Sequence, residues 1–183
     1  ADDYGRPKLT DRHVLPMLSI TKQLGRGADI LYPTGHYSEG GFASVKEIGT
    51  HSERHRSPWR SKREVALFRG RPNTHTLSRY ALPRLMNGSE LVDVGLVWYH
   101  GEHDPFRFPS GPRKPGLGLP PLPVLDELPM ERHKEYKYLL NLDGHSYSHR
   151  LLKLLASNSL VIKEETADVE YYYHLLRPWV HYV

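Results

Sequence analysis

The stretch that decides the expected fold runs from an apolar segment through a polar loop into a leucine-faced helix: Tyr136-Lys137-Tyr138-Leu139-Leu140-Asn141-Leu142-Asp143-Gly144-His145-Ser146-Tyr147-Ser148-His149-Arg150. The apolar run predicts a strand over 138–142, and the leucines that follow predict an amphipathic helix over 150–157. A helix that begins directly after such a loop exposes unpaired N–H groups beside Arg150, which suits a phosphate group. The alternative is that Ser146 or Ser148 only caps the helix and that Arg150 is solvated.

Strands and helices are expected to alternate along the rest of the chain. Further strands are predicted at 29–32, 65–68, 91–94 and 159–162, and further helices at 76–86 and 167–176. Several of the strand runs are continuously apolar, as in strands that are buried on both faces of a parallel sheet. The order of elements therefore predicts an α/β fold with a parallel sheet.

A proline-rich segment interrupts this alternation at about 105–129. Proline at this density excludes helix interiors and central strands, so the segment is expected to form a long surface loop. The alternative is a proline-rich ligand for a partner module.

Composition narrows the class of protein. Hydrophobic residues make up 38% of the 183 residues and charged residues 25%, a balance that argues against wholesale disorder. No apolar run approaches the roughly 18 residues of a membrane helix, so no span is expected. The absence of cysteine excludes disulfides, thiolate metal ligands and a cysteine nucleophile. The net charge of +4 permits an anionic ligand without demanding nucleic acid.

The ends of the chain are typical of a fragment. The chain begins Ala1-Asp2-Asp3 without an initiator Met, and it closes on the apolar stretch 177–183. Because natural termini are usually polar and loosely ordered, we expect this chain to be a piece of a longer protein.

Several pieces of the chain, taken in order, resemble one known family. They are Asp29-Ile30-Leu31-Tyr32-Pro33, Glu39-Gly40-Gly41, Phe68-Arg69-Gly70, the run 137–150, Ala156-Ser157-Asn158-Ser159-Leu160-Val161, Glu170-Tyr171-Tyr172-Tyr173 and the run 177–183. In their residues and their order these pieces resemble glycosyltransferase family 90, the family of protein O-glucosyltransferases and fungal capsule xylosyltransferases. The resemblance covers most of the chain outside the proline-rich segment.

The resemblance implies a fold and a reaction. The fold would be part of a two-domain GT-B architecture, with Rossmann-like parallel sheets and a nucleotide-sugar cleft between the domains. Residues 1–48 would be the tail of the N-terminal, acceptor-side domain, and 49–183 a nucleotide-sugar-binding domain truncated at its C-terminus. The reaction would be inverting transfer of glucose or xylose from a UDP-sugar to a protein or glycan hydroxyl, without a cofactor or an obligatory metal, in the lumen of the endoplasmic reticulum or Golgi.

The same resemblance assigns roles to residues. Asp3 would be the base that deprotonates the acceptor hydroxyl, with Asp2 as second choice. Arg69, beside Gly70, would hold phosphate oxygens. The nucleotide-sugar pocket would further be lined by Gly144, His145, Ser146, Tyr147, Ser148, His149 and Arg150, with Glu170 gripping the ribose. Glu39, Gly40 and Gly41 would lie on the acceptor and sugar side.

Alternatives stay open at this point. Arg69 could be a salt-bridge partner, and Glu170 could lie on a helix surface. The protein could be a nucleotide-sugar-binding remnant without catalysis, or an RNA-binding module that uses the basic run 54–71. His51 and His55 have a zinc-like spacing, but no third ligand is arranged nearby, so we expect no metal.

Overall fold

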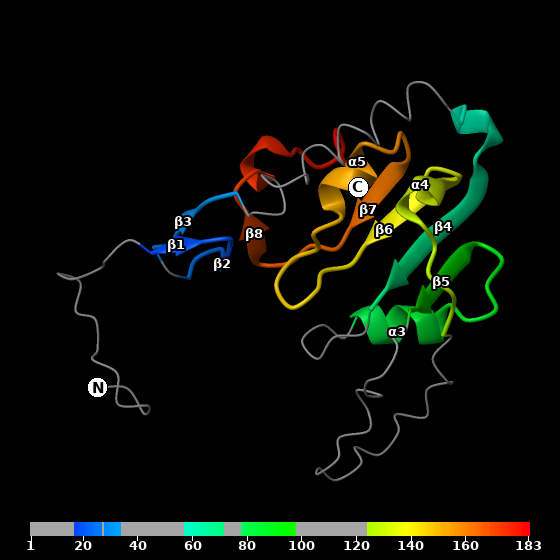
Figure 1. Ribbon diagram of the computed structural model, residues 1–183, viewed down its shortest axis with the longest axis horizontal. Coiled ribbons are helices and arrows are strands. Elements are labelled where there is room, and N and C mark those ends of the chain that lie inside the picture. Colours follow the sequence, from blue (N-terminus) through cyan, green and yellow to red (C-terminus); the bar gives the residue numbers. More distant parts are fainter. Residues whose placement is uncertain (1–16, 27, 34–56, 72–77, 98–123) are drawn as a thin grey trace, which may run out of the picture.

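A four-stranded parallel sheet forms the centre of the protein, with the strand order β5-β4-β6-β7 (Figure 1). The strands are β4 (Arg63–Gly70), β5 (Val92–Leu96), β6 (Tyr136–Asn141) and β7 (Leu160–Lys163). The computed structural model describes residues 17–26, 28–33, 57–71, 78–97 and 124–183, and every structural statement concerns these residues.

Both faces of this sheet are buried, as its apolar sequence predicts. Leu67 and Phe68 are neighbours on β4, so their side chains point to opposite faces, yet each is only 1% exposed. All neighbouring strands run parallel. The strands predicted at 65–68, 91–94, 138–142 and 159–162 are therefore confirmed, as is the α/β class with a parallel sheet.

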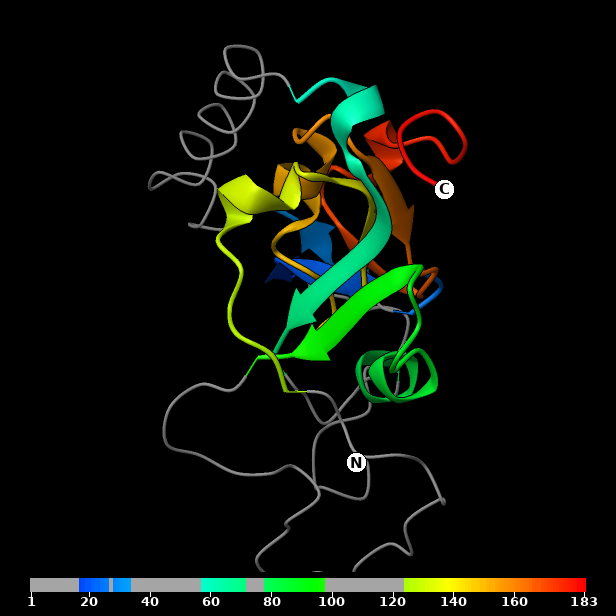
Figure 2. The ribbon, with the colours of Figure 1, turned by 90° about the vertical axis from the view of Figure 1, so that its right-hand side faces the viewer.

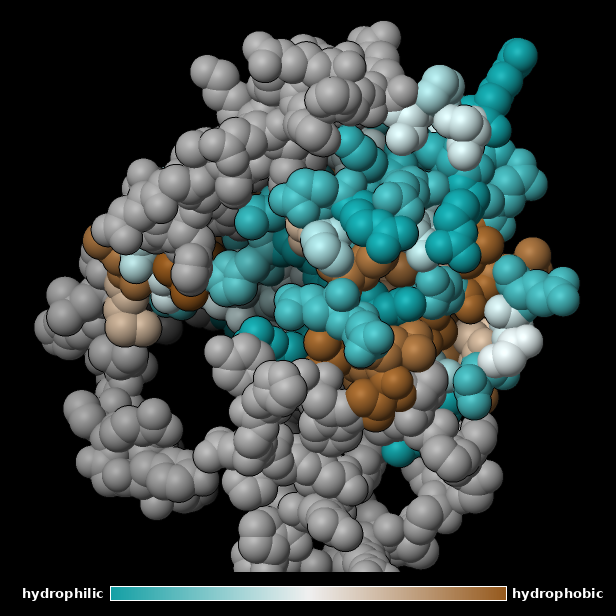
Figure 3. All heavy atoms as spheres, turned by 45° about the vertical axis from the view of Figure 1, so that its right-hand side comes forward, coloured by the Kyte–Doolittle hydropathy of each residue, from teal (hydrophilic) through white to brown (hydrophobic). Residues whose placement is uncertain are grey.

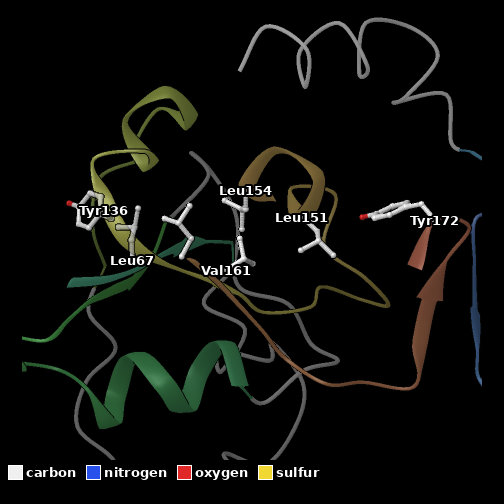
Figure 4. Packing of buried hydrophobic residues seen from close by; sticks show 7 residues of the cluster. Leu67, Tyr136, Leu151, Leu154, Val161 and Tyr172 are labelled. Carbon is white, nitrogen blue, oxygen red and sulfur yellow. The ribbon is translucent and has the colours of Figure 1, made fainter. Parts of the chain in front are cut away.

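Helices cover the two faces of the sheet from opposite sides (Figures 1 and 2). On one face α3 (Ser78–Leu85) packs over an apolar cluster that consists of Phe68, Tyr80, Val94, Leu96 and Leu142. On the other face lie α4 (Met130–His133) and α5 (Leu151–Leu155). There a second cluster consists of Leu67, Tyr136, Leu139, Leu151, Leu154, Val161 and Tyr172 (Figure 4).

The order of the strands reverses at the middle of the sheet. From β4 the chain passes through α3 to β5 on one side, whereas from β6 it passes through α5 to β7 on the other. The two directions diverge between β4 and β6. In open α/β sheets, ligands bind outside the carboxyl ends of the strands at such a switch point.

Two small sheets lie beside the carboxyl ends of β6 and β7 (Figure 1). In one, β1 (Leu18–Ser19) pairs in parallel with β3 (Ile30–Leu31), which confirms the strand predicted at 29–32. In the other, β2 (Thr21–Gln23) pairs antiparallel with β8 (Asp168–Glu170). This pairing joins segments from both sides of the domain boundary predicted at residue 48, and that boundary stays a prediction.

The helix predicted over 167–176 is wrong. This segment forms β8 and then a short 3-10 turn, η2 (Tyr173–Leu175). Residues 168–170 pair with residues 21–23 of β2, and the three tyrosines that follow lie in a turn and in η2. Tertiary pairing therefore overrides a helical pattern of only ten residues.

The proline-rich segment is described only at its end. Its residues 105–123 lie outside the described ranges, as do 98–104. Val124 then bridges to Leu96, and the N–H of Leu125 donates to the Leu96 carbonyl at 2.9 Å. In a separate part of the fold, a 3-10 turn, η1 (Trp59–Ser61), lies shortly before the first residue of β4.

Most of the coloured surface in Figure 3, which belongs to the described residues, is hydrophilic, with apolar atoms gathered in a smaller area. Exposed large side chains include Leu85 and Leu91, which flank the connection from α3 to β5. Scattered exposed apolar side chains are normal on proteins and indicate no function by themselves.

Candidate functional site

The candidate site lies at the switch point, where β4 ends at Gly70 and β6 ends just before Gly144. Two glycines at these ends keep space for neighbouring groups. A Cβ atom on Gly70 would lie 2.8 Å from Nη2 of Arg150, and one on Gly144 would lie 2.9 Å from the Tyr147 carbonyl oxygen. Both glycines are therefore required by close packing around the loop 144–150.

Arg79, at the start of the described part of α3, links the ends of β4 and β6 by hydrogen bonds to main-chain carbonyls. Its Nε donates to the Asp143 carbonyl at 2.7 Å, and its Nη2 to the Leu142 carbonyl at 2.9 Å. Its Nη1 donates to the carbonyl of Arg71, just after β4, at 3.0 Å. The side chain is buried, with 8% of the residue exposed. The sequence reading did not single out this residue.

Arg150, immediately before α5, reaches back to the end of β4. Its Nη1 donates to the Arg69 carbonyl, and its guanidinium carbon lies 4.9 Å from the centre of the Phe68 ring. No carboxylate in the described part of the chain forms a salt bridge with Arg150. Among the described residues, the Arg69 carbonyl is the one hydrogen-bond acceptor of the Arg150 guanidinium, which carries five N–H donors.

Two guanidinium groups, those of Arg79 and Arg150, place positive charge at the ends of β4 and β6. Burial, followed by the neighbouring Arg79, lowers the pKa of Arg150 to about 9. Burial also lowers the pKa of Arg79, and the Asp143 carboxylate opposes that shift. The Arg150 guanidinium stays protonated at neutral pH, but burial and the charge of Arg79 make its charged form less stable than in water. Binding of an anion would relieve that cost.

In contrast to Arg150, Arg69 uses its guanidinium in a salt bridge with a carboxylate. Its Nη2 forms a salt bridge with Oδ1 of Asp93 at 2.6 Å, and its Nη1 donates to the Asp93 carbonyl at 2.9 Å. Asp93 also accepts a hydrogen bond from the Tyr136 hydroxyl at 2.9 Å. The salt-bridge alternative considered from the sequence is therefore present. The group of Arg69 that contacts Arg150 is its main-chain carbonyl.

The loop 144–150 combines buried and exposed groups. Gly144, Tyr147 and Ser148 are buried, whereas His145 and His149 are exposed and Ser146 is half-buried. The helix predicted over 150–157 is confirmed but contains only residues 151–155, with no side-chain cap from either serine. A helix of five residues adds little dipole, so the positive charge of the site comes from the arginine side chains.

Glu170 lies on β8, opposite Thr21 of β2, and is only 2% exposed. The helix-surface alternative for this residue is therefore wrong. The Tyr172 hydroxyl donates to its Oε1 at 3.1 Å. Burial raises the pKa of the Tyr147 hydroxyl to about 12, and the charge of Glu170 adds to the shift. The charge of Glu170 is thus felt by one residue of the loop 144–150, and its role in gripping the ribose stays a prediction.

Several predicted site residues lie outside the described residues. They are Asp2, Asp3, Glu39, Gly40 and Gly41, together with His51 and His55. Within the described ranges, no group of three or more His, Asp or Glu residues could hold a metal ion.

The basic run 54–71 is exposed only in part where it is described, from residue 57 onward: Arg60, Arg63 and Arg71 are exposed, whereas Lys62 and Arg69 have structural partners. Lys62 is 4% exposed, and its Nζ donates to the carbonyls of Lys134 and Ser157. Arg69 is paired with Asp93, as described above. These contacts give no support to the RNA-binding alternative.

The parallel sheet, with helices on both faces and a reversal of strand order between β4 and β6, defines a Rossmann-like α/β protein, a class in which ligands bind at the strand ends of the switch point. Comparison with protein families matches residues 6–183 to glycosyl transferase family 90. The chain belongs to this family. The match begins after Asp2 and Asp3.

Named relatives are similar over most of this chain. O-glucosyltransferase rumi of Drosophila pseudoobscura pseudoobscura is 32% identical over 179 residues, which cover 92% of this chain and 41% of the relative. Protein O-glucosyltransferase 1 of Bos taurus is 29% identical over 193 residues, which cover 99% of this chain and 46% of the relative. The chain therefore spans less than half the length of these relatives. No helix among the described residues is long and apolar enough to cross a membrane.

Proposed function

We propose that the protein transfers glucose or xylose from a UDP-sugar to a hydroxyl group of a protein or glycan, with inversion at the sugar carbon. Membership of glycosyl transferase family 90 supports the glycosyl transfer. The names of the relatives, which are O-glucosyltransferases, favour glucose as the sugar and a protein as the acceptor.

The observation that carries the proposal is the position of Arg150. Its guanidinium lies at the switch point of the sheet, beside a second buried arginine and without a carboxylate partner among the described residues. Glycosyl transfer from UDP-glucose leaves a UDP anion, so the transition state develops negative charge on the diphosphate. A positioned guanidinium stabilises that charge and thereby assists departure of the leaving group.

The other half of the chemistry needs a base. We assign it to Asp3, with Asp2 as second choice, because a carboxylate within hydrogen-bond reach of the acceptor hydroxyl can take its proton as the hydroxyl attacks. Glu39, Gly40 and Gly41 would contact acceptor and sugar. Glu170 would accept hydrogen bonds from the ribose.

The remaining parts of the proposal concern the whole protein. The described sheet would be the nucleotide-sugar domain of a GT-B fold whose partner domain supplies the acceptor side. The reaction would need no metal, and the protein would work in the lumen of the endoplasmic reticulum or Golgi. Retention of transfer activity in excess EDTA is the result expected for a metal-free reaction.

Binding of UDP tests the central observation. Arg150→Gln should weaken UDP binding by about tenfold or more, because a charge-assisted hydrogen bond to phosphate is lost. Arg132→Gln is the matched control, since Arg132 is exposed and pairs only with Glu135 among the described residues. Isothermal titration calorimetry measures both. Equal UDP affinity in the two variants would remove Arg150 from the site.

Release of UDP from UDP-glucose tests catalysis. Asp3→Asn should lower the rate by roughly 10²–10⁴ if Asp3 is the base, and Asp2→Asn should leave it nearly unchanged. A protein that binds UDP tightly, yet releases none from UDP-glucose in the presence of acceptor, would be the non-catalytic remnant instead.

A further inference from the structure

One aromatic ring touches both arginines of the switch point. The guanidinium carbon of Arg150 lies 4.9 Å from the centre of the Phe68 ring, and that of Arg79 lies 5.8 Å from it. Both distances are within the roughly 6 Å over which a cation is attracted by the electron-rich face of an aromatic ring. Phe68 itself is 1% exposed, so the attraction acts in a poorly solvated environment.

The Phe68 ring offsets part of the repulsion between the guanidiniums of Arg79 and Arg150. Two guanidiniums beside one another repel, and burial removes the water that would screen them. Arg79 has three carbonyl acceptors, whereas Arg150 has one and lacks a carboxylate among the described residues. Contact with the Phe68 ring therefore supplies part of the attraction that keeps Arg150 in this position.

Gly70 makes this contact possible. A Cβ atom at this position would lie 2.6 Å from Cζ of Phe68 and 2.8 Å from Nη2 of Arg150. These distances are shorter than real carbon contacts, so a side chain would push the ring or the guanidinium away. The glycine after Arg69 therefore protects the contact between Phe68 and Arg150.

We propose that Phe68 is a positioning residue for the diphosphate site: its ring holds the Arg150 guanidinium, next to Arg79, in the place where it receives the phosphates. The inference rests on the proposed function, since it assigns the anion held by Arg150 to the diphosphate of the donor. Phe68 contacts no ligand itself and acts through Arg150.

Phe68→Leu tests the proposal because it keeps an apolar side chain in the same cluster and removes the aromatic face. The variant should bind UDP about five- to thirtyfold more weakly than the wild type, whereas its affinity for uridine, which has no phosphate, should change by less than about twofold. Val94→Ala is the control, since Val94 is the β5 partner of Phe68 and belongs to the same cluster. It should leave both affinities unchanged.

The outcomes separate the two proposals. If wild-type protein does not bind UDP, the proposed function fails. If the wild type binds UDP and Phe68→Leu binds it equally well, or loses UDP and uridine affinity in parallel, the positioning role is wrong. Should Phe68→Leu fail to fold by circular dichroism, Phe68→Met decides with the same pair of ligands, and selective loss of UDP affinity is again the supporting result.

Discussion

His133 is a buried imidazole in a strongly cationic environment. It is 4% exposed, and its Nε2 lies 3.3 Å from the Leu128 carbonyl oxygen. Burial lowers its pKa to about 4, and the charges of Arg150 and Arg69 add to the shift, against the hydrogen bond to the Leu128 carbonyl and the smaller effect of Glu131. His133 is therefore neutral in the folded protein at neutral pH.

This pKa predicts acid sensitivity. Between pH 6.5 and about 4 the unfolded chain binds a proton at His133 and the folded chain does not, so the free energy of unfolding should fall as the pH falls through this window. The loss should reach up to about 3 kcal/mol. Urea unfolding from pH 7 to pH 4 measures it. His133→Leu should flatten the profile, whereas His174→Gln, at an exposed position, should keep it.

Lys62 is the second buried titratable residue with a clear structural role. Its Nζ donates to the Lys134 carbonyl at 2.5 Å, the Ser157 carbonyl at 3.2 Å and the Ser159 hydroxyl at 2.9 Å. One ammonium group thus joins the start of β4 to the turns before β6 and β7.

Lys62→Met should lower the free energy of unfolding by about 2–4 kcal/mol, because buried acceptors lose their donor. Arg60→Met, two residues earlier at an exposed position, should change it by less than about 0.5 kcal/mol. Equal stability of the two variants in urea would contradict the structural role of Lys62.

At the scale of elements, the strands were the predictable part. Largely apolar runs of four or five residues suffice to locate β4 to β7, because strands of a sheet that is covered on both faces have few polar side chains. The helix predicted over 167–176 is wrong because residues 168–170 form a strand and the tyrosines 171–173 follow it in a turn and a 3-10 segment. The pairing with β2 decides between a helix and a strand, and no local pattern contains that information.

At the scale of elements, the loop between β6 and α5 allows a testable prediction at Gly144. Gly144→Ala should disturb the turn, since its Cβ would lie 2.9 Å from the Tyr147 carbonyl oxygen, which also accepts the Gly144 N–H at 3.1 Å. The expected cost is about 1–3 kcal/mol of stability, with weaker UDP binding. Gly88→Asn is a control at a turn with φ of +82°, where asparagine is tolerated and no atom lies within 4 Å. Unfolding in urea and UDP titration report both effects.

For the whole molecule, the site is assembled from contacts between distant parts of the sequence. The bond from Arg79 to the Asp143 carbonyl joins residues 64 positions apart, and that from Arg150 to the Arg69 carbonyl joins residues 81 apart. The sequence points to Arg150 by its place at the start of a helix, and to Gly70 by its place beside Arg69 at the end of a strand. It missed Arg79 because a basic residue on a helix is usually solvated, and only the sheet order turns it toward the loop.

A ligand that binds only the folded state must stabilise the whole molecule. UDP at a hundredfold excess over its dissociation constant should therefore raise the free energy of unfolding by about 2.7 kcal/mol. A thermal-shift series with UDP, GDP and uridine measures the effect. Equal shifts with UDP and GDP would show that the base is not recognised.

The last residue of the chain contributes to the sheet in a further way. The N–H of Val183 donates to the Val161 carbonyl at 2.9 Å, and the N–H of Lys163 donates to the Val183 carbonyl at 2.8 Å. Because β7 is the outermost strand on its side among the described strands of the sheet, these two bonds occupy backbone groups that could otherwise pair with a strand from a second molecule. The two hydrogen bonds of Val183 thus shield β7 against self-association with a second molecule.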